Sequence, residues 1–164
     1  MMTVRVGFGY DTHGFCEGDH IVIGGERIRF SHGIDAHSDG DVLLHAICDA
    51  VLGAAGLGDI GQHFPDSQSR YRDVESTRLL EDVMQKIEDR YWVGNVDCTV
   101  VLERPKLAGY IDAMKSNIGR ILKISASQVN LKATTSEGMG FIGRGEGVAA
   151  FAVVLLQQHS PAGS

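Results

Sequence analysis

Apolar and polar residues alternate in the first thirty positions at the two-residue spacing of β-strands. Residues 4–8, "VRVGF", read as one strand, and residues 20–30, "HIVIGGERIRF", read as two short strands joined at Gly24 and Gly25. The polar segment between them, "GYDTHGFCEGD", is expected to form a turn. The pattern therefore predicts a strand followed by a hairpin.

Helical spacing replaces this alternation further along the chain. A first helix is predicted over residues 39–56, with Ser38 or Asp39 as its N-cap. A long polar loop, residues 58–73, separates it from a second helix that runs from Val74 or Glu75 to Tyr91. A third helix is expected within residues 106–124, where apolar residues recur every three or four positions.

The C-terminal half of the chain contains further predicted strands. Residues 95–103 and the end of 125–135 read as strands, and residues 148–156, "VAAFAVVLL", read as a buried strand, although their alanine content leaves a helix open. Strands and helices are mixed without strict alternation, which favours the α+β class. We expect a single domain over residues 1–158, with a mixed sheet of four to five strands covered by helices on one face, and a flexible tail at 159–164.

Composition and charge narrow the range of partners. The formal net charge of −6 argues against nucleic acid and anionic membrane surfaces as partners, and an anionic ligand would need local positive potential from a metal or a few basic residues. Cys16, Cys48 and Cys98 form no close pair and fit reduced thiols. No window approaches 18 consecutive apolar residues. We expect a cytoplasmic protein of bacterial type, or a plastid-type compartment if a transit peptide was removed.

The first predicted helix carries ionisable residues on an otherwise apolar surface. At about 100° per residue, Asp41, His45 and Asp49 fall on one stripe of the helix, and the other positions are almost all apolar. Burying such groups costs free energy unless they are paired, hydrogen-bonded or bound to a metal. The stripe therefore indicates either a shielded site or an exposed polar face with a satisfied histidine.

A calcium loop is excluded for the segment that leads into this helix. Asp35, Asp39 and Gly40 fall in the register of an EF-hand. His37, however, replaces an oxygen ligand, and Ala46 stands where the bidentate glutamate must be.

Asp11 and His13 form an Asp-x-His pair just past the first predicted strand. In an extended chain both side chains point to the same side. Alone, the pair also fits a solvated turn. Joined by His45, it would make a set of three protein ligands with an open fourth position, which is the coordination of a catalytic zinc ion.

The segment 134–147, "TTSEGMGFIGRGEG", combines hydroxyls and glycine amides with Arg144 and Glu137. Such a segment can cradle an anion, and Glu137 can bind a hard cation. It contains Gly-x-Gly-x-x-Gly, but a dinucleotide motif should end a strand and open a helix, whereas another glycine-rich turn follows here. A flexible surface loop is the alternative, and Lys106 in "ERPKLAGY" marks a helix start.

The segments "GYDTHGF", "AHSDGDVLLHAICDAVLGAAGLGDIGQHFPD", "RPKL" and "KATTSEGMGFIGRGEG" together resemble the 2-C-methyl-D-erythritol 2,4-cyclodiphosphate synthases of the non-mevalonate pathway of isoprenoid biosynthesis. The resemblance extends from residue 4 to about residue 156. It implies a CMP-releasing phosphorus–oxygen lyase. In that reaction the 2-phosphate of 4-diphosphocytidyl-2-C-methyl-D-erythritol 2-phosphate attacks the β-phosphorus, which closes a cyclic diphosphate and expels CMP.

The resemblance also implies a role for each matching residue. Asp11, His13 and His45 would hold one zinc-like divalent cation, and Glu137 with the substrate phosphates would hold one Mg²⁺ or Mn²⁺. His37 and Thr135 would stabilise the transition state. The substrate-binding residues would be Asp11, Thr12, His13, His37, Ser38, Asp59, Ile60, Gly61, Phe64, Pro65, Asp66, Ser67, Gln68, Leu102, Glu103, Arg104, Pro105, Lys106, Leu107, Ala108, Thr134, Thr135, Ser136, Glu137, Phe141 and Arg144.

The family resemblance further implies a homotrimer with active sites between adjacent subunits. Arg144 and Glu146 would lie near a central cavity that can take an isoprenoid diphosphate. The chain departs from the family's usual residues at Gln68, Leu102, Glu103 and Gly138.

Two other functions fit the same residues. A metal-dependent phosphohydrolase of nucleoside diphosphate esters would use the ions to activate water and would give linear products. A non-enzymatic binding trimer would hold the metal structurally, but a structural zinc needs four protein ligands, and the sequence offers no obvious fourth beside Asp11, His13 and His45.

Overall fold

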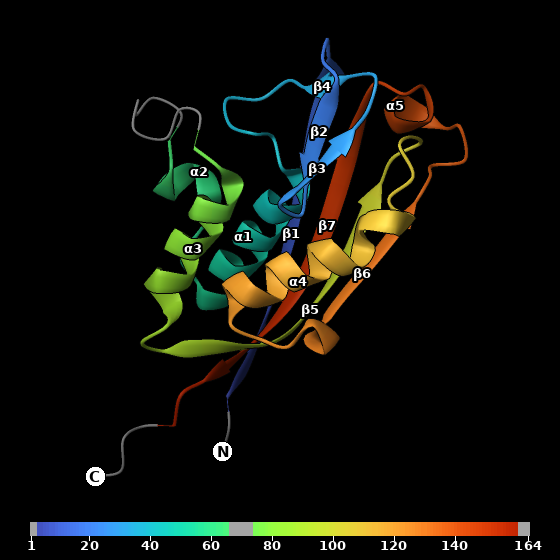
Figure 1. The fold of residues 1–164 in the computed structure, drawn as a ribbon. Helices are drawn as coiled ribbons and strands as arrows, with labels where there is room; N and C mark the ends of the chain where they lie inside the picture. Colours follow the sequence, from blue (N-terminus) through green and yellow to red (C-terminus); the bar gives the residue numbers. More distant parts are fainter. Residues whose placement is uncertain (1–2, 66–73, 161–164) are drawn as a thin grey trace.

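A computed structural model describes residues 3–65 and 74–160 of the chain. It contains one main sheet of five strands, a separate two-stranded hairpin, and helices that pack against one face of the sheet (Figure 1). The predicted α+β class and mixed sheet are confirmed. No helix in the described parts of the chain is long and apolar enough to cross a membrane.

The main sheet has the order β4-β1-β7-β5-β6. Its strands are β1 (Val4–Cys16), β4 (Gly33–Ile34), β5 (Tyr91–Val101), β6 (Val129–Thr134) and β7 (Gly147–Gln158). Neighbouring strands are antiparallel except β5 and β6, which are parallel. Two strands, β7 and β5, therefore separate β1 from β6. The predicted hairpin is confirmed as β2 (His20–Ile23) and β3 (Glu26–Arg29), and Gly24 and Gly25 supply the positive φ angles of its turn, 60° and 76°.

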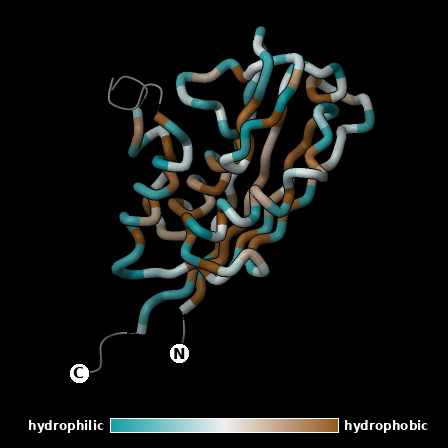
Figure 2. The backbone as a smooth tube through the Cα atoms, viewed as in Figure 1, coloured by the Kyte–Doolittle hydropathy of each residue, from teal (hydrophilic) through white to brown (hydrophobic). Residues whose placement is uncertain are grey.

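Three helices of three to four turns cover one face of the sheet (Figure 1): α1 (Val42–Ala55), α3 (Ser76–Ile87) and α4 (Ile111–Leu122). Two single-turn helices, α2 (Ile60–His63) and α5 (Gly140–Gly143), lie in connecting segments, and 3-10 turns occupy Ala108–Tyr110 and Ala126–Gln128. Helix α1 is the centre of the core, because eleven of its residues are buried. Its apolar residues meet those of the strands, whereas the loops are largely polar (Figure 2).

Helix α1 lies directly on the backbone of β1. A Cβ atom built at Gly9 would be 1.8 Å from the carbonyl oxygen of Ala46, and one at Gly7 would be 1.8 Å from that of Ala50. Only glycine permits this approach, because contacts below 3.0 Å are essentially never seen for a real Cβ. The two glycines therefore set the distance between the strand that carries Asp11 and His13 and the helix that carries His45.

The other face of the sheet is open and partly apolar. Alternation along β1 exposes Val6, Phe8 and Tyr10, each between 44% and 66%. On the neighbouring β7, Val153 is exposed and pairs with Phe8 in the register, and Phe151 lies 5.1 Å from the Tyr10 ring. The β1 and β7 half of this face is thus an exposed apolar surface.

Several predicted boundaries were wrong. Strand β1 continues to Cys16 instead of turning near residue 9, because its backbone stays paired with β7 as far as Gly14. The N-cap of α1 is Asp41, and α3 ends at Ile87 because Tyr91 already begins β5.

Other details of the predictions also changed with the structure. The predicted polar loop contains α2, whereas the predicted strand over residues 148–156 is confirmed as part of β7. Residues 161–164 of the predicted tail lie outside the described residues.

Candidate metal centre and flanking pockets

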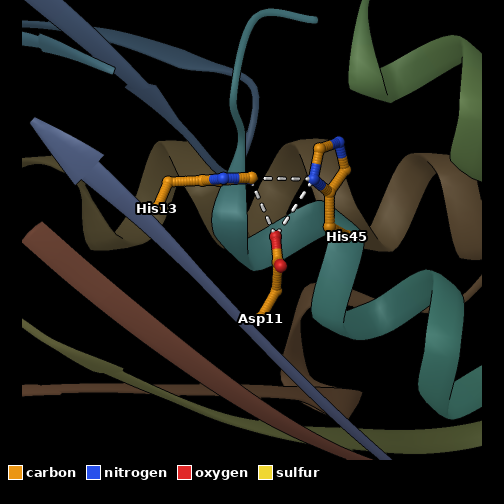
Figure 3. A group of neighbouring side chains, drawn as sticks. All are labelled: Asp11, His13 and His45. Carbon is orange, nitrogen blue, oxygen red and sulfur yellow. Dashed lines mark hydrogen bonds and ion pairs between the residues drawn. The ribbon is translucent and has the colours of Figure 1, made fainter. Parts of the chain in front are cut away.

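Asp11, His13 and His45 converge at the surface of β1 that faces α1 (Figure 3). The Asp11 Oδ2 atom is 2.9 Å from His13 Nε2 and 3.1 Å from His45 Nδ1, and the two ring nitrogens are 3.2 Å apart. Alternation along β1 brings the first two residues to the same side, as predicted. His45 lies in the first turn of α1, and this position brings its side chain next to Asp11 and His13.

The donor set of this cluster fits a zinc-like ion. Two imidazole nitrogens and one carboxylate oxygen lie within 4.8 Å of one another, and this is the one such group of three or more found among the described residues. Nitrogen and oxygen donors of this kind suit Zn²⁺, and three protein ligands leave a position for substrate. The three side chains are partly buried, with between 13% and 25% of each exposed to solvent.

Asp11 and His45 of the cluster shift the pKa values of each other. Burial raises the pKa of Asp11, but hydrogen bonds and the positive charges of the two histidines outweigh it and lower the pKa to about 2. Burial lowers the pKa of His45, yet the hydrogen bond and charge of Asp11 raise it overall. The carboxylate therefore stays ionised and available as a ligand over the physiological range.

Asp41 fixes the N-terminus of α1. Its carboxylate is completely buried and accepts the backbone N–H groups of Gly24 at 2.9 Å, Gly25 at 2.7 Å and Leu44 at 3.1 Å. Burial raises its pKa to about 6, against the opposing effect of the three N–H donors. The β2–β3 turn is thereby tied to the first turn of the helix that presents His45.

Asp49, the third member of the predicted stripe, accepts the N–H of Ile60 at 2.7 Å and so holds α2 beside α1. Burial raises its pKa. Each residue of the stripe therefore has its own partner, which explains how a nearly apolar helix accommodates them.

A cavity of about 340 Å³ opens beside the metal cluster. It joins the cluster to the loop before α1 and to apolar residues of α2 and α3. Its lining is Asp11, His13, Asp35, Ala36, His37, Ser38, His45, Ile60, Gly61, Phe64 and Leu79.

A second cavity, of about 310 Å³, lies between β5, β6 and the start of α4. It shares no lining residue with the first. Its lining is Leu102, Glu103, Pro105, Lys106, Leu107, Ala108, Ile111, Leu131, Ala133, Thr134 and Thr135.

Glu103 connects this cavity to the glycine-rich loop. Its Oε1 accepts the N–H of Ser136 at 2.9 Å, the Ser136 hydroxyl at 3.1 Å and the N–H of Gly138 at 3.4 Å. The residue between them, Glu137, has a left-handed φ of 55°, which places it in a region uncommon for a non-glycine residue. Glu103 thus holds the turn on which Glu137 is presented.

The predicted site residues divide between the two cavities. The first cavity is lined by eight of them. The second is lined by six residues within 102–108 and by Thr134 and Thr135. The Thr12 hydroxyl donates to the carbonyl of Val148 and lies outside both, and Asp59 caps α2 by accepting the N–H of Gln62. Pro65, Arg104, Ser136, Glu137, Phe141 and Arg144 line neither cavity, and Asp66, Ser67 and Gln68 lie outside the described residues.

Some lining residues were not predicted. Leu79, Ile111 and Leu131 carried only the signal of core positions, and Asp35 and Ala36 only that of a loop. Their place in a cavity depends on tertiary packing, which no local pattern encodes.

Comparisons with known proteins agree with this geometry. A sequence model of the YgbB family matches residues 4–157. A relative from Methylococcus capsulatus, named 2-C-methyl-D-erythritol 2,4-cyclodiphosphate synthase, is 59% identical over 156 residues, which are 94% of this chain and 99% of the relative.

Two solved structures have the same fold. The bifunctional IspDF from Campylobacter jejuni matches 98% of this chain with a TM-score of 0.93 and 40% identity, and this chain spans 44% of that one. The IspF of Plasmodium falciparum, solved as a CDP complex, matches 96% of this chain and 97% of its own with a TM-score of 0.84 and 33% identity.

Proposed function

The chain belongs to the YgbB family, and we propose that it catalyses the CMP-releasing cyclisation of 4-diphosphocytidyl-2-C-methyl-D-erythritol 2-phosphate. A 2-phosphate oxygen attacks the β-phosphorus, the bond between that phosphorus and the oxygen bridging to the α-phosphorus breaks, and CMP leaves with the bridging oxygen. The product is 2-C-methyl-D-erythritol 2,4-cyclodiphosphate, an isoprenoid precursor. The enzyme is accordingly a phosphorus–oxygen lyase, and we assign it to the cytoplasm of a bacterial-type cell.

The observation that carries this proposal is the cluster of Asp11, His13 and His45 in the lining of a cavity that also contains His37 and Ser38. A zinc-like ion bound there supplies a Lewis acid for a phosphate oxygen. His37 and Ser38 offer an imidazole and a hydroxyl to the phosphate oxygens, and His37 is the proposed stabiliser of the transition-state charge.

The remaining lining of this cavity suits the carbon skeleton of the substrate. Ile60, Phe64 and Leu79 contribute apolar surface to the lining. Such surface holds the methylerythritol in a folded conformation, which brings the 2-phosphate and the diphosphate into reach of each other. It also limits the access of water, the competing nucleophile.

The second cavity suits the cytidine and its phosphates. Lys106 brings a positive charge, and Thr134 and Thr135 bring hydroxyl donors, to an otherwise apolar lining. Thr135 is the second proposed catalytic residue. The CDP complex of the related Plasmodium falciparum IspF supports a cytidine nucleotide as the ligand of this fold.

Glu137 is proposed to hold a Mg²⁺ or Mn²⁺ ion together with the substrate phosphates. A carboxylate on an exposed turn is a suitable ligand for a hard cation. With a zinc-like ion at the cluster, this ion accounts for the binding of a polyanionic substrate by a chain whose formal net charge is −6.

A homotrimer with shared active sites is part of the proposal. The exposed apolar side chains of Val6, Phe8, Tyr10 and Val153 lie on neighbouring strands and suit a subunit interface. The two cavities are on strands three positions apart in the sheet, about 14 Å at the usual strand spacing. A cytidine cavity from a neighbouring subunit would complete the site beside the metal cluster. Arg144 and Glu146, which pair at 2.9 Å, are proposed to face a central cavity that takes an isoprenoid diphosphate.

Two experiments test these proposals. In water enriched in ¹⁸O, the cyclase leaves the product unlabelled, because the nucleophile is the substrate's own phosphate. The alternative phosphohydrolase incorporates one ¹⁸O atom for each bond broken, and label in the product would overturn the proposed reaction. A binding trimer with a structural metal would release no CMP.

The shared site is tested by mixing two inactive variants, His45→Ala and Lys106→Ala. If adjacent subunits supply the two halves of a site, randomly mixed trimers recover about a quarter of the sites. No recovery after subunit exchange would show that each site lies within one chain.

A further inference from the structure

His45 has a second ring nitrogen that points away from the metal cluster. Its Nδ1 faces Asp11 and His13, and its Nε2 lies 2.9 Å from the hydroxyl oxygen of Ser76. Ser76 is the first residue of α3 and is completely buried. A side chain from another helix thus reaches the back of a metal ligand.

Ser76 is itself held by Asp39. The Ser76 hydroxyl donates to Asp39 Oδ1, and the Ser76 N–H donates to Asp39 Oδ2 at 3.0 Å. Asp39 belongs to the loop before α1, where its Oδ1 also accepts the N–H of Asp41 at 3.2 Å. The chain Asp39–Ser76–His45 therefore links the loop, α3 and α1.

Counting protons along this chain shows that Nε2 of His45 carries a proton. An ionised carboxylate only accepts hydrogen bonds, and a serine hydroxyl has one proton to donate. Because Ser76 gives that proton to Asp39, its oxygen accepts from His45, and the donor must be Nε2–H. Without a metal, Nδ1–H can donate to the Asp11 carboxylate. A metal bound at the cluster would replace that proton, and the imidazole, still protonated at Nε2, would direct its Nδ1 lone pair toward the metal.

We propose that Ser76 and Asp39 are positioning residues that hold His45 in the Nε2–H form and orient Nδ1 as a metal ligand. The inference rests on the metal site of the proposed function and adds two residues that bind neither metal nor substrate there. Ser38 is a weaker candidate for this task, because its hydroxyl oxygen is 3.5 Å from the same nitrogen and accepts the N–H of Gly40. Metal ligands of this kind depend on such partners for their affinity.

The first test measures Zn²⁺ affinity by competition with a chromophoric chelator. Ser76→Ala is expected to weaken Zn²⁺ binding about 10- to 100-fold. The matched control is Ser116→Ala, the same change at an exposed position of α4, which should bind Zn²⁺ as the wild type does. Ser76→Thr keeps the hydroxyl and should restore most of the affinity. An affinity of Ser76→Ala within twofold of the wild type would overturn the inference.

A double variant separates positioning from general damage to the fold. Asp39→Asn should also weaken Zn²⁺ binding, because the amide cannot accept both hydrogen bonds of Ser76. If both residues act through one chain of hydrogen bonds, Ser76→Ala with Asp39→Asn binds Zn²⁺ no more weakly than Ser76→Ala alone. Effects that multiply in the double variant would contradict a shared action on His45.

The imidazole state is read directly by long-range ¹H–¹⁵N NMR of the histidine side chains. The wild-type protein is expected to show a protected Nε2–H for His45 with and without Zn²⁺, and Ser76→Ala should lose that protection. An unprotonated Nε2 would overturn the inference even if Zn²⁺ binds. Conversely, a protected Nε2–H in a protein that binds no Zn²⁺ would uphold the hydrogen-bond chain and refute the proposed metal site.

Discussion

Gly9→Ala should damage the metal centre although residue 9 touches neither metal nor substrate. The added Cβ would lie 1.8 Å from the carbonyl oxygen of Ala46, and it needs at least 3.0 Å. Helix α1 must therefore move away from β1 by at least 1.2 Å, carrying His45 from Asp11 and His13. Metal–ligand distances tolerate about 0.2 Å, so the three donors could no longer bind one ion together.

The expected magnitudes follow from this displacement. Overpacking should lower the free energy of unfolding by about 1–3 kcal/mol, and a misplacement of about 1 Å should lower the catalytic rate about 100-fold. Urea denaturation, Zn²⁺ titration and a CMP-release assay measure the three effects. The control is Gly53→Ala, since a Cβ there meets no atom within 4 Å and a helical alanine should stabilise the protein by about 0.5–1 kcal/mol. A Gly9→Ala protein with wild-type Zn²⁺ affinity and stability would refute the reasoning.

Three further predictions concern single carboxylates. Glu137→Gln should raise the Mg²⁺ concentration needed for activity and leave the Zn²⁺ content unchanged, as metal analysis and a Mg²⁺ titration can check; loss of Zn²⁺ instead would contradict separate metal sites. Asp41→Asn should cost about 1–3 kcal/mol in urea unfolding, because its amide cannot accept all three backbone N–H groups, and an unchanged midpoint would argue against that role. Asp11 has a folded pKa of about 2 against 3.8 when unfolded, so its contribution to metal-free stability is present above pH 3.8 and lost as the pH falls through 2. The stability difference between wild type and Asp11→Asn should shrink accordingly by about 2 kcal/mol, and a pH-independent difference would contradict the cause given for that pKa.

Local sequence patterns were enough to predict those features that depend on residues close together in the chain. Alternation put Asp11 and His13 on one side of a strand, helical rotation aligned Asp41, His45 and Asp49, and two glycines marked the hairpin turn. That the first two meet His45 was a hypothesis raised by the residue types and supported by the family resemblance, not a result of any local pattern. The physical cause of this meeting is the contact of α1 with the glycines of β1.

The remaining features depend on residues far apart in the chain. Ser38, Asp39 and Asp41 are all good N-caps, and Asp41 is the actual cap partly because the hairpin turn, 16 and 17 residues earlier, donates two N–H groups to it. Strand β1 is long because β7 pairs with it, more than 130 residues later. Ser76 and His45 are 31 residues apart in the chain, and the sequence around Ser76 indicates only the start of a helix.

The central claim is the cyclisation itself, and ³¹P NMR of the reaction tests it most directly. The purified protein is mixed with 4-diphosphocytidyl-2-C-methyl-D-erythritol 2-phosphate, Zn²⁺ and Mg²⁺. Cyclisation should give two mutually coupled resonances of a cyclic diphosphate that grow together with the resonance of CMP. CMP accompanied by linear phosphates, or no turnover by the metal-loaded protein, would contradict it.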